Sequence, residues 1–142
     1  MPTIRVSVTT SLSVPDAVRR LIDFGPSRAD AWANVNSESV RVHDQGPNWA
    51  DVTEGNRLAW ERERYDWDAE AGTVSSVTTD SNLWQSGPAW DYRVTAQPGG
   101  GSIVEVTAQR DGKGVKGKLV AVLLSIIGTR MIKSSTARAL RS

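Results

Sequence analysis

The chain has 142 residues, of which 39% are hydrophobic and 23% charged, and its formal net charge is +1. This length predicts one domain, residues 1–142, that is large enough to bury a core. No cysteine is present, which excludes disulfides, thiol nucleophiles and thiolate metal sites. The first residues carry no signal pattern, and no apolar run reaches the roughly 20 residues that cross a bilayer, so a cytoplasmic location is expected.

The N-terminal part of the chain predicts a strand and two short helices. Apolar residues alternate with polar ones over residues 3–9, as in a half-buried strand. Ser13 then begins a capping pattern with an early proline and an acid three residues on. The pattern recurs over residues 27–30, so we expect a second short helix that carries Trp32.

Residues 38–110 predict six consecutive strands, separated by breaks rich in glycine, proline, asparagine and aspartate. Short connections favour antiparallel pairing, because parallel strands need long crossovers. The predicted strands span residues 38–44, 49–54, 57–67, 73–85, 89–97 and 102–110.

The C-terminal part predicts a long helix over residues 115–140 of unusual character. Residues 110–142 hold eight basic residues and one acid, whereas residues 1–109 hold nine basic residues and fifteen acids. Residues 119–127 (LVAVLLSII) are apolar on every side of a helix, which indicates covering on more than one face. We expect the sheet to close on this helix and to bury about eight of its apolar side chains.

The order of elements, with several local motifs, resembles the START/Bet v 1-like superfamily of polyketide cyclase-like and lipid-transfer proteins. The resemblance covers nearly the whole chain and is strongest to uncharacterised actinobacterial members. It implies an α+β helix-grip fold, in which a curved seven-stranded antiparallel sheet surrounds a long C-terminal helix and two short helices follow the first strand. It also implies a hydrophobic ligand held between sheet and helix. The segments that carry it are VHDQGPNWADVTEG (42–55), WERERYDWD (60–68), TTDSNLWQSGPAWDYRV (78–94) and RDGKGVKGKL (110–119).

The candidate ligand-binding residues come from two sides of the expected cavity. On the helix, spacings of four, three and four place four side chains on one face. On the sheet, aromatic rings offer apolar area with a polar handle, although such rings are also ordinary core residues. The candidates are Val120, Leu124, Ile127 and Met131 from the helix and Trp60, Trp84, Trp90 and Tyr92 from the sheet.

The strand WERERYDW carries an aromatic residue and several charges on each of its faces. Whichever face turns inward therefore brings charge under the helix, and a buried charge must be paired or hydrated. We take Arg62 as the polar anchor of a wet cavity. The alternative is that these charges form cross-strand pairs at the rim of the sheet.

The glycine spacing Gly112-x-Gly114-x-x-Gly117 matches a dinucleotide-binding fingerprint, but no strand follows the helix and no acid lies about 20 residues on. What remains is a glycine-rich link beside Lys113, Lys116 and Lys118. These lysines are candidates for anion or membrane contact at a helix N-terminus, and a flexible hinge with solvated lysines is the alternative.

Two polar residues are weaker candidates for chemistry. His43 is the only histidine and has no nucleophile motif near it, so it is interpreted as a strand residue. Asp80 would serve as a general base only if its surroundings raised its pKa, and a hydrogen-bonded turn is the simpler interpretation. We assign no catalytic residue, no metal site and no cofactor.

Three functional hypotheses follow. The first is a protein that binds or transports a hydrophobic small molecule or lipid, with possible peripheral contact to a membrane. The second is a polyketide cyclase or aromatase that uses Asp80 or Arg62 in the same cavity. The third is an interaction protein whose apolar helix docks on another chain. Nucleic acid is not expected as a partner, because the basic residues are interleaved with aliphatic and not with aromatic side chains.

Overall fold

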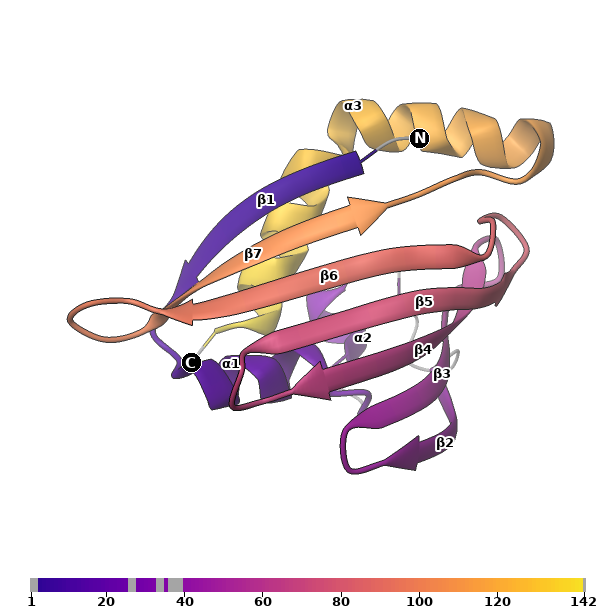
Figure 1. Ribbon diagram of the computed structural model, residues 1–142. Helices are drawn as coiled ribbons and strands as arrows, with labels where there is room; N and C mark the ends of the chain where they lie inside the picture. Colours follow the sequence, from indigo (N-terminus) through magenta and orange to yellow (C-terminus); the bar gives the residue numbers. More distant parts are fainter. Residues whose placement is uncertain (1–2, 26–27, 33–34, 36–39, 142) are drawn as a thin grey trace.

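The computed structural model describes residues 3–25, 28–32, 35 and 40–141, and within them seven strands form one curved antiparallel sheet (Figure 1). The order of strands across the sheet is β1-β7-β6-β5-β4-β3-β2, so the predicted meander is confirmed and β1 joins it at the β7 edge. The beginning of the strand predicted over residues 38–44 lies outside the described residues. The strands are β1 (Thr3–Thr10), β2 (Arg41–Gly46), β3 (Trp49–Gly55), β4 (Trp60–Asp68), β5 (Thr73–Ser81), β6 (Gly87–Ala96) and β7 (Ser102–Gln109).

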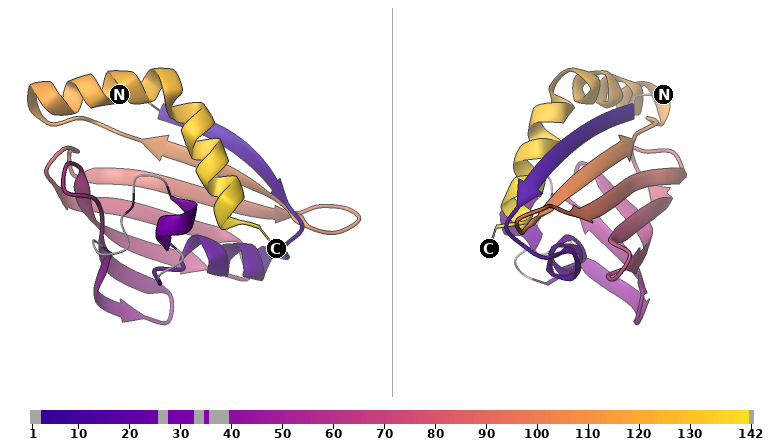
Figure 2. Two further views of the ribbon diagram at one scale, coloured as in Figure 1. Left: turned by 180° about the vertical axis from the view of Figure 1, so that it is seen from behind. Right: turned by 60° about the vertical axis from the view of Figure 1, so that its left-hand side comes forward.

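Strict alternation of apolar residues fixes the inner face of the sheet at β1 and β7. Val6 pairs with Val106 and Val8 pairs with Val104, and all four side chains are buried. A slip of one residue would turn these valines to solvent, which is why the pattern specifies the register. The core therefore lies on the concave side of the sheet, where the helices are found (Figure 2).

The segment after β1 contains one helix and one further helical turn. α1 (Val14–Leu21) begins at Ser13, whose hydroxyl accepts a hydrogen bond from the backbone N–H of Asp16 at 3.3 Å. The prediction of two short helices is wrong, because α2 (Arg28–Ala31) is a single turn of four residues and Trp32 lies beyond its end. The guanidinium of Arg28 is buried and anchors this turn to the core. The cap predicted at residue 27 lies outside the described residues.

The long C-terminal helix α3 (Gly114–Ala139) bends as it crosses the molecule (Figure 2). Its second half descends in front of the sheet toward α1 and α2, and its first half runs along the outer boundary of the molecule. Gly128 is buried against β1, where an added Cβ would lie 2.7 Å from Cδ1 of Ile4. Glycine at this position therefore lets helix and strand approach closely.

The side chains that α3 buries are mostly small, which differs from the expectation of about eight large apolar ones. The buried residues are Gly117, Ala121, Gly128, Ile132, Ser135, Thr136 and Ala139. Most of the large aliphatic residues of its first half point instead to solvent, whereas Val120 and Leu124 face the sheet. The helix lies too close to β1 for large side chains to fit between them. Among the described residues, no helix is long and apolar enough to cross a membrane.

Candidate functional site in the cavity between the sheet and α3

A cavity of about 180 Å³ lies between the inner face of the sheet and α3. Its walls combine the rings of Trp60, Trp84, Trp90 and Tyr92 with the helix side chains Val120, Leu124 and Met131. An engineered apolar cavity of about 150 Å³ binds benzene. The enclosed part of this cavity therefore has room for about one ring.

Trp90 of β6 is the centre of the aromatic wall. Its ring stacks on Tyr92, with centroids 6.2 Å apart and an interplanar angle of 15°, and meets Trp32 edge-on at 6.5 Å. The guanidinium of Arg110 lies 5.6 Å from the ring of Trp90 and 4.5 Å from that of Trp84. Contacts between a cation and aromatic faces stabilise the charge in a place where water is scarce.

Arg110 is buried beneath these rings and is paired with Glu61 of β4. Its Nη2 lies 2.6 Å from Oε2 of Glu61, and the Thr78 hydroxyl donates to the same oxygen at 3.3 Å. Burial raises the pKa of Glu61, while Arg110 acts in the opposite direction. The other guanidinium nitrogens of Arg110 make no hydrogen bond to the described residues. They are also not fully enclosed, so they remain available to a guest in the cavity.

A second buried pair joins Arg28 to Glu54 at the other end of the cavity wall. Arg28 donates to both carboxylate oxygens, from Nε at 2.8 Å and from Nη2 at 3.2 Å, and also to the carbonyl of Leu21. Burial alone would raise the pKa of Glu54, but Arg28 and the hydrogen bond from Tyr65 outweigh it, and the pKa is lowered. Glu54 is therefore an ionised carboxylate held by a bidentate arginine.

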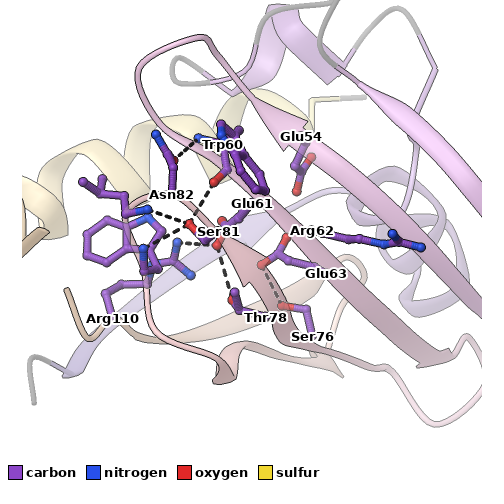
Figure 3. A network of polar contacts seen from close by, with 12 residues as sticks. Glu54, Trp60, Glu61, Arg62, Glu63, Ser76, Thr78, Ser81, Asn82 and Arg110 are labelled. Carbon is purple, nitrogen blue, oxygen red and sulfur yellow. Dashed lines mark hydrogen bonds and ion pairs between the residues drawn. The ribbon is translucent and has the colours of Figure 1, made fainter. Parts of the chain in front are cut away.

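Glu63 lies between these two pairs without a basic partner of its own (Figure 3). It is fully buried, and its contacts are the hydroxyls of Tyr65 at 2.7 Å and Ser76 at 3.3 Å. Burial, together with the nearby charges of Glu61 and Glu54, raises its pKa well above the usual value. These surroundings therefore favour the neutral, protonated form of Glu63.

The hydroxyl of Tyr92 also faces this cavity. Tyr92 is buried, and its hydroxyl makes no hydrogen bond to any described residue. In the described part of the chain, the Thr136 hydroxyl is the fully enclosed side-chain group without a partner, so the Tyr92 hydroxyl keeps contact with the cavity space. Burial raises its pKa, which keeps the phenol neutral and able to donate a hydrogen bond.

Another hollow, of about 380 Å³, lies at the surface near the C-terminal end of α3. Its walls carry Arg20, Arg138, Arg141 and Asp23, and the carbonyl of Arg141 accepts a hydrogen bond from Arg20. Although larger, it is a hydrated recess between charged side chains. The cavity beneath α3 combines rings with buried polar groups, which is the character of a small-molecule site.

Seven of the nine residues expected to contact a ligand line this cavity, namely Trp60, Trp84, Trp90, Tyr92, Val120, Leu124 and Met131. The two others do not. Ile127 is exposed to solvent over 56% of its surface. The alternation of β4 turns Arg62 to the outer face, where it pairs with Asp51 at 2.7 Å and extends away from Arg110 and Glu61 (Figure 3).

The remaining sequence candidates lie outside the cavity. Asp80 is exposed and accepts a hydrogen bond from the backbone N–H of Ser81, which corrects the idea that it is a cavity base. His43 is exposed in β2 and contacts the hydroxyl of Thr53 at 2.7 Å. Lys113 directs its ammonium to the carbonyl of Ser81 at 2.7 Å, whereas Lys116 and Lys118 are exposed on α3.

The glycine motif before α3 is explained by close packing. Gly112 and Gly117 touch, and a Cβ on Gly112 would overlap the backbone of Gly117. A Cβ on Gly117 would in turn lie 2.6 Å from the carbonyl oxygen of Leu83. These glycines hold the beginning of α3 against the loop after β5, and through it they position Trp84 and Arg110.

Sequence reasoning missed Arg110, Glu61, Glu63 and Glu54 as the polar part of the site. The signal for Arg110 was present, because it continues the inward alternation of Val104, Val106 and Ala108. No comparable signal distinguished the two faces of β4. Their assignment depends on Arg28 and Arg110, which are distant in sequence and reach the inner face from two other segments.

The fold is shared with solved structures at low sequence identity. The Zhui aromatase/cyclase from Streptomyces sp. R1128 superposes with a TM-score of 0.79 at 12% identity, covering 98% of this chain and 91% of that one. The protein TTHA0849 from Thermus thermophilus gives a TM-score of 0.77 at 14% identity, covering 98% and 97%. A START superfamily protein from Mycobacterium smegmatis gives 0.64 at 8%, covering 93% and 96%. No protein-family model and no curated protein matches the sequence.

Proposed function

The chain has the START/Bet v 1-like helix-grip fold, and from this premise we propose that it binds a hydrophobic small molecule or lipid between the sheet and α3. The main evidence for this proposal is the cavity, whose aromatic wall lies beside two polar groups, Arg110 and the Tyr92 hydroxyl, that have unused hydrogen-bonding capacity. The fold neighbours support this proposal, since they include a START superfamily protein and an aromatase/cyclase. A cytoplasmic location remains a prediction.

The arrangement of the walls indicates the chemistry of the guest. One ring or a branched aliphatic end fits beside Trp90, while Arg110 and Tyr92 offer donors to a carbonyl or carboxylate oxygen. Glu61 already neutralises Arg110, so a carbonyl can be accepted without leaving a charge unpaired. The proposed ligand is therefore an apolar, ring-bearing molecule with an oxygen function at one end.

Calorimetric titration with ethylbenzene and with acetophenone, one-ring compounds that differ in a carbonyl oxygen, tests this proposal. We expect both compounds to bind with one-to-one stoichiometry, and acetophenone to bind about tenfold more tightly because its carbonyl gains a charge-assisted hydrogen bond. Leu124→Trp should fill the cavity and abolish binding. The matched control is Ile127→Trp, which places the same ring on the solvent side of α3 and should leave binding unchanged.

The absence of saturable binding to the wild-type protein would refute the proposal. Equal binding by the two tryptophan variants would also refute it, because the probes would then bind elsewhere. Native mass spectrometry of freshly purified protein complements the titration. A co-purifying apolar molecule, lost in Leu124→Trp, would identify the guest directly.

A second candidate function, a cyclase- or aromatase-like reaction in the same cavity, is favoured by one observation. Glu63 is a buried acid in contact with Tyr65, and Tyr65 lines the cavity. In such a dehydration the Tyr65 hydroxyl turns its proton from Glu54 to a substrate hydroxyl that leaves as water, and Glu63 returns a proton to Tyr65. The Glu54 carboxylate, which also lines the cavity, takes the proton lost from the neighbouring carbon of the substrate. Burial raises the pKa of Tyr65 well above its usual value, so the phenol stays protonated as this transfer requires.

Tyr65→Phe separates the two functions. A binding protein should keep its affinity for acetophenone in this variant, because the phenol is already engaged with Glu54 and Glu63. An enzyme should lose turnover of a linear poly-β-ketone thioester while still binding it. If the wild-type protein does not accelerate cyclisation or dehydration of that substrate, the enzymatic alternative is rejected.

A further inference from the structure

The first half of α3 exposes a continuous apolar face that no other element covers within the described residues. Of the ten large hydrophobic side chains that are exposed in the described part of the chain, six lie between residues 115 and 127 of this helix. They are Val115, Leu119, Val122, Leu123, Ile126 and Ile127, and each has more than half of its surface exposed. Exposed apolar patches of this kind mark sites of interaction.

Helical geometry gathers these side chains into one stripe. At about 100° per residue, Val115, Leu119, Val122 and Ile126 fall within a narrow arc, and Leu123 and Ile127 border it. The opposite side of the helix carries the buried Gly117, Ala121 and Gly128. The stripe therefore has no role in holding α3 against the sheet.

The charges around the stripe are all positive. Lys116 and Lys118 are exposed on its two flanks, and Arg130 and Lys133 continue along the helix, whereas the last acid of the sequence is Asp111. A second copy of this chain docked face to face would bring two such basic surfaces together. The charge therefore favours an anionic occupant over a dimer.

We propose that this face of α3 docks on an anionic lipid surface, with the aliphatic stripe entering the headgroup region and the lysines contacting phosphate. The first half of α3 lies at the outer boundary of the molecule as a convex rod, a shape that suits a flat membrane surface (Figure 2). An apolar face with basic residues at its edges is the pattern of helices that lie in the membrane interface. The proposal does not depend on the contents of the cavity.

Sedimentation with vesicles tests the docking surface. Vesicles of phosphatidylcholine containing one quarter phosphatidylglycerol should bind the protein about tenfold more strongly than vesicles of phosphatidylcholine alone. Lys116→Glu with Lys118→Glu should remove this preference, and raising the salt concentration should weaken binding. Leu119→Glu with Ile126→Glu should abolish binding to both kinds of vesicle.

Val42→Glu is the control, because Val42 is an exposed apolar residue of β2, at the edge of the sheet opposite to β1 and α3, and this variant should bind as the wild type does. All substituted positions are exposed, and circular dichroism verifies that each variant is folded. Absence of binding to either kind of vesicle would overturn the proposal. The proposal would also be overturned if the wild-type protein formed a dimer at micromolar concentration and Leu119→Glu with Ile126→Glu dissociated that dimer. A third contradicting result would be that the protein binds poly-glutamate as strongly as the anionic vesicles and that this double variant binds poly-glutamate equally well.

Discussion

The hydroxyl oxygen of Tyr65 lies 2.7 Å from Oε2 of Glu63, within a network that also places it 2.5 Å from Oε1 of Glu54 and 3.1 Å from Nη2 of Arg28. A phenol has one proton to donate, so it can serve only one of the two carboxyl groups as donor. The contacts are all satisfied when Tyr65 donates to Glu54 and a protonated Glu63 donates to Tyr65. Geometry and electrostatics thus both favour the protonated form of Glu63.

Glu63→Gln should weaken the loss of stability at high pH. The raised pKa of Glu63 means that the folded protein retains a proton that the unfolded chain releases above about pH 4.5. Glu63 therefore lowers the free energy of unfolding as the pH rises from that value toward its pKa in the folded protein, by up to about 1.4 kcal/mol per pH unit. Glutamine removes this contribution, which urea unfolding at a series of pH values would reveal.

Glu61 changes the free energy of unfolding with pH in the same direction as Glu63, and Glu54 changes it in the opposite direction. The contribution of Glu63 is therefore read from the difference between wild type and variant at each pH. Glu70→Gln, at an exposed turn, is the control and should leave the profile unchanged. A Glu63→Gln profile parallel to that of the wild type would show that Glu63 is ionised in the folded protein.

Arg28→Ala and Arg62→Ala should differ strongly although both break an arginine–carboxylate pair. Arg28 is buried with Glu54, so its removal leaves an uncompensated buried charge and should cost about 3–5 kcal/mol. Arg62 and Asp51 retain 43% and 27% exposure, and their pair should contribute at most about 1 kcal/mol. Chemical denaturation measures both, and equal losses would contradict the assignment of the inner and outer faces of the sheet.

Thr136→Val should stabilise the protein. The Thr136 hydroxyl is fully buried and, among the described residues, is the enclosed side-chain group without a hydrogen-bond partner. Valine has nearly the same shape without the polar group, so the expected gain is about 1 kcal/mol or more. Thr78→Val is the matched substitution with the opposite expectation, because the Thr78 hydroxyl donates to Glu61. Thermal unfolding of the two variants should give shifts of opposite sign.

Gly117→Ala should destabilise the protein more than Gly128→Ala. The new methyl group at residue 117 would lie 2.6 Å from the carbonyl oxygen of Leu83, and a backbone atom cannot move aside easily. At residue 128 it meets the ends of the Ile4 and Leu124 side chains, which can adjust. Overpacking costs about 1–3 kcal/mol, against a gain of about 1 kcal/mol in helix propensity. Equal unfolding free energies for the two variants would contradict the packing described.

Replacing Glu61 and Arg110 together by glutamine should leave ethylbenzene binding intact and remove the preference for acetophenone. The double substitution removes both charges of the pair, so neither is left buried alone. Calorimetry on the double variant measures this, with Arg62→Gln as a control on the outer face of the sheet. A preference that survives in the double variant would exclude Arg110 as the polar anchor.

The strands and the long helix could be predicted because local patterns determine them. Alternation fixed β1, β6 and β7, and turn residues marked the breaks between strands. The faces of β4 could not be assigned, since WERERYDW carries charge on both and its burial is decided by Arg28 and Arg110 from elsewhere. This is also why Arg62 was taken for the anchor that Arg110 supplies.

The prediction that the sheet buries about eight large apolar side chains of α3 was wrong for a related reason. A helix that is apolar all round indicates contact on several sides, but the sequence does not say whether those contacts lie within the chain. Close approach to β1 at Gly128 favours small residues on the buried side, and most of the leucines and isoleucines of the first half lie outside. Such spacing between elements is a property of the folded sheet and has no local signature.

Two faces of α3 lie in different environments, since Val120 and Leu124 face the cavity while Leu119 and Ile126 face outward. If contact with a lipid surface displaces α3, the volume of the cavity between α3 and the sheet changes. In the same way, a ligand that displaces α3 from within the cavity changes the position of its outer face. Thermodynamic reciprocity then requires equal factors in both directions. A ligand that raises the affinity of the protein for vesicles tenfold must bind tenfold more tightly to the vesicle-bound protein. A ligand that lowers the affinity for vesicles must bind more weakly to the vesicle-bound protein.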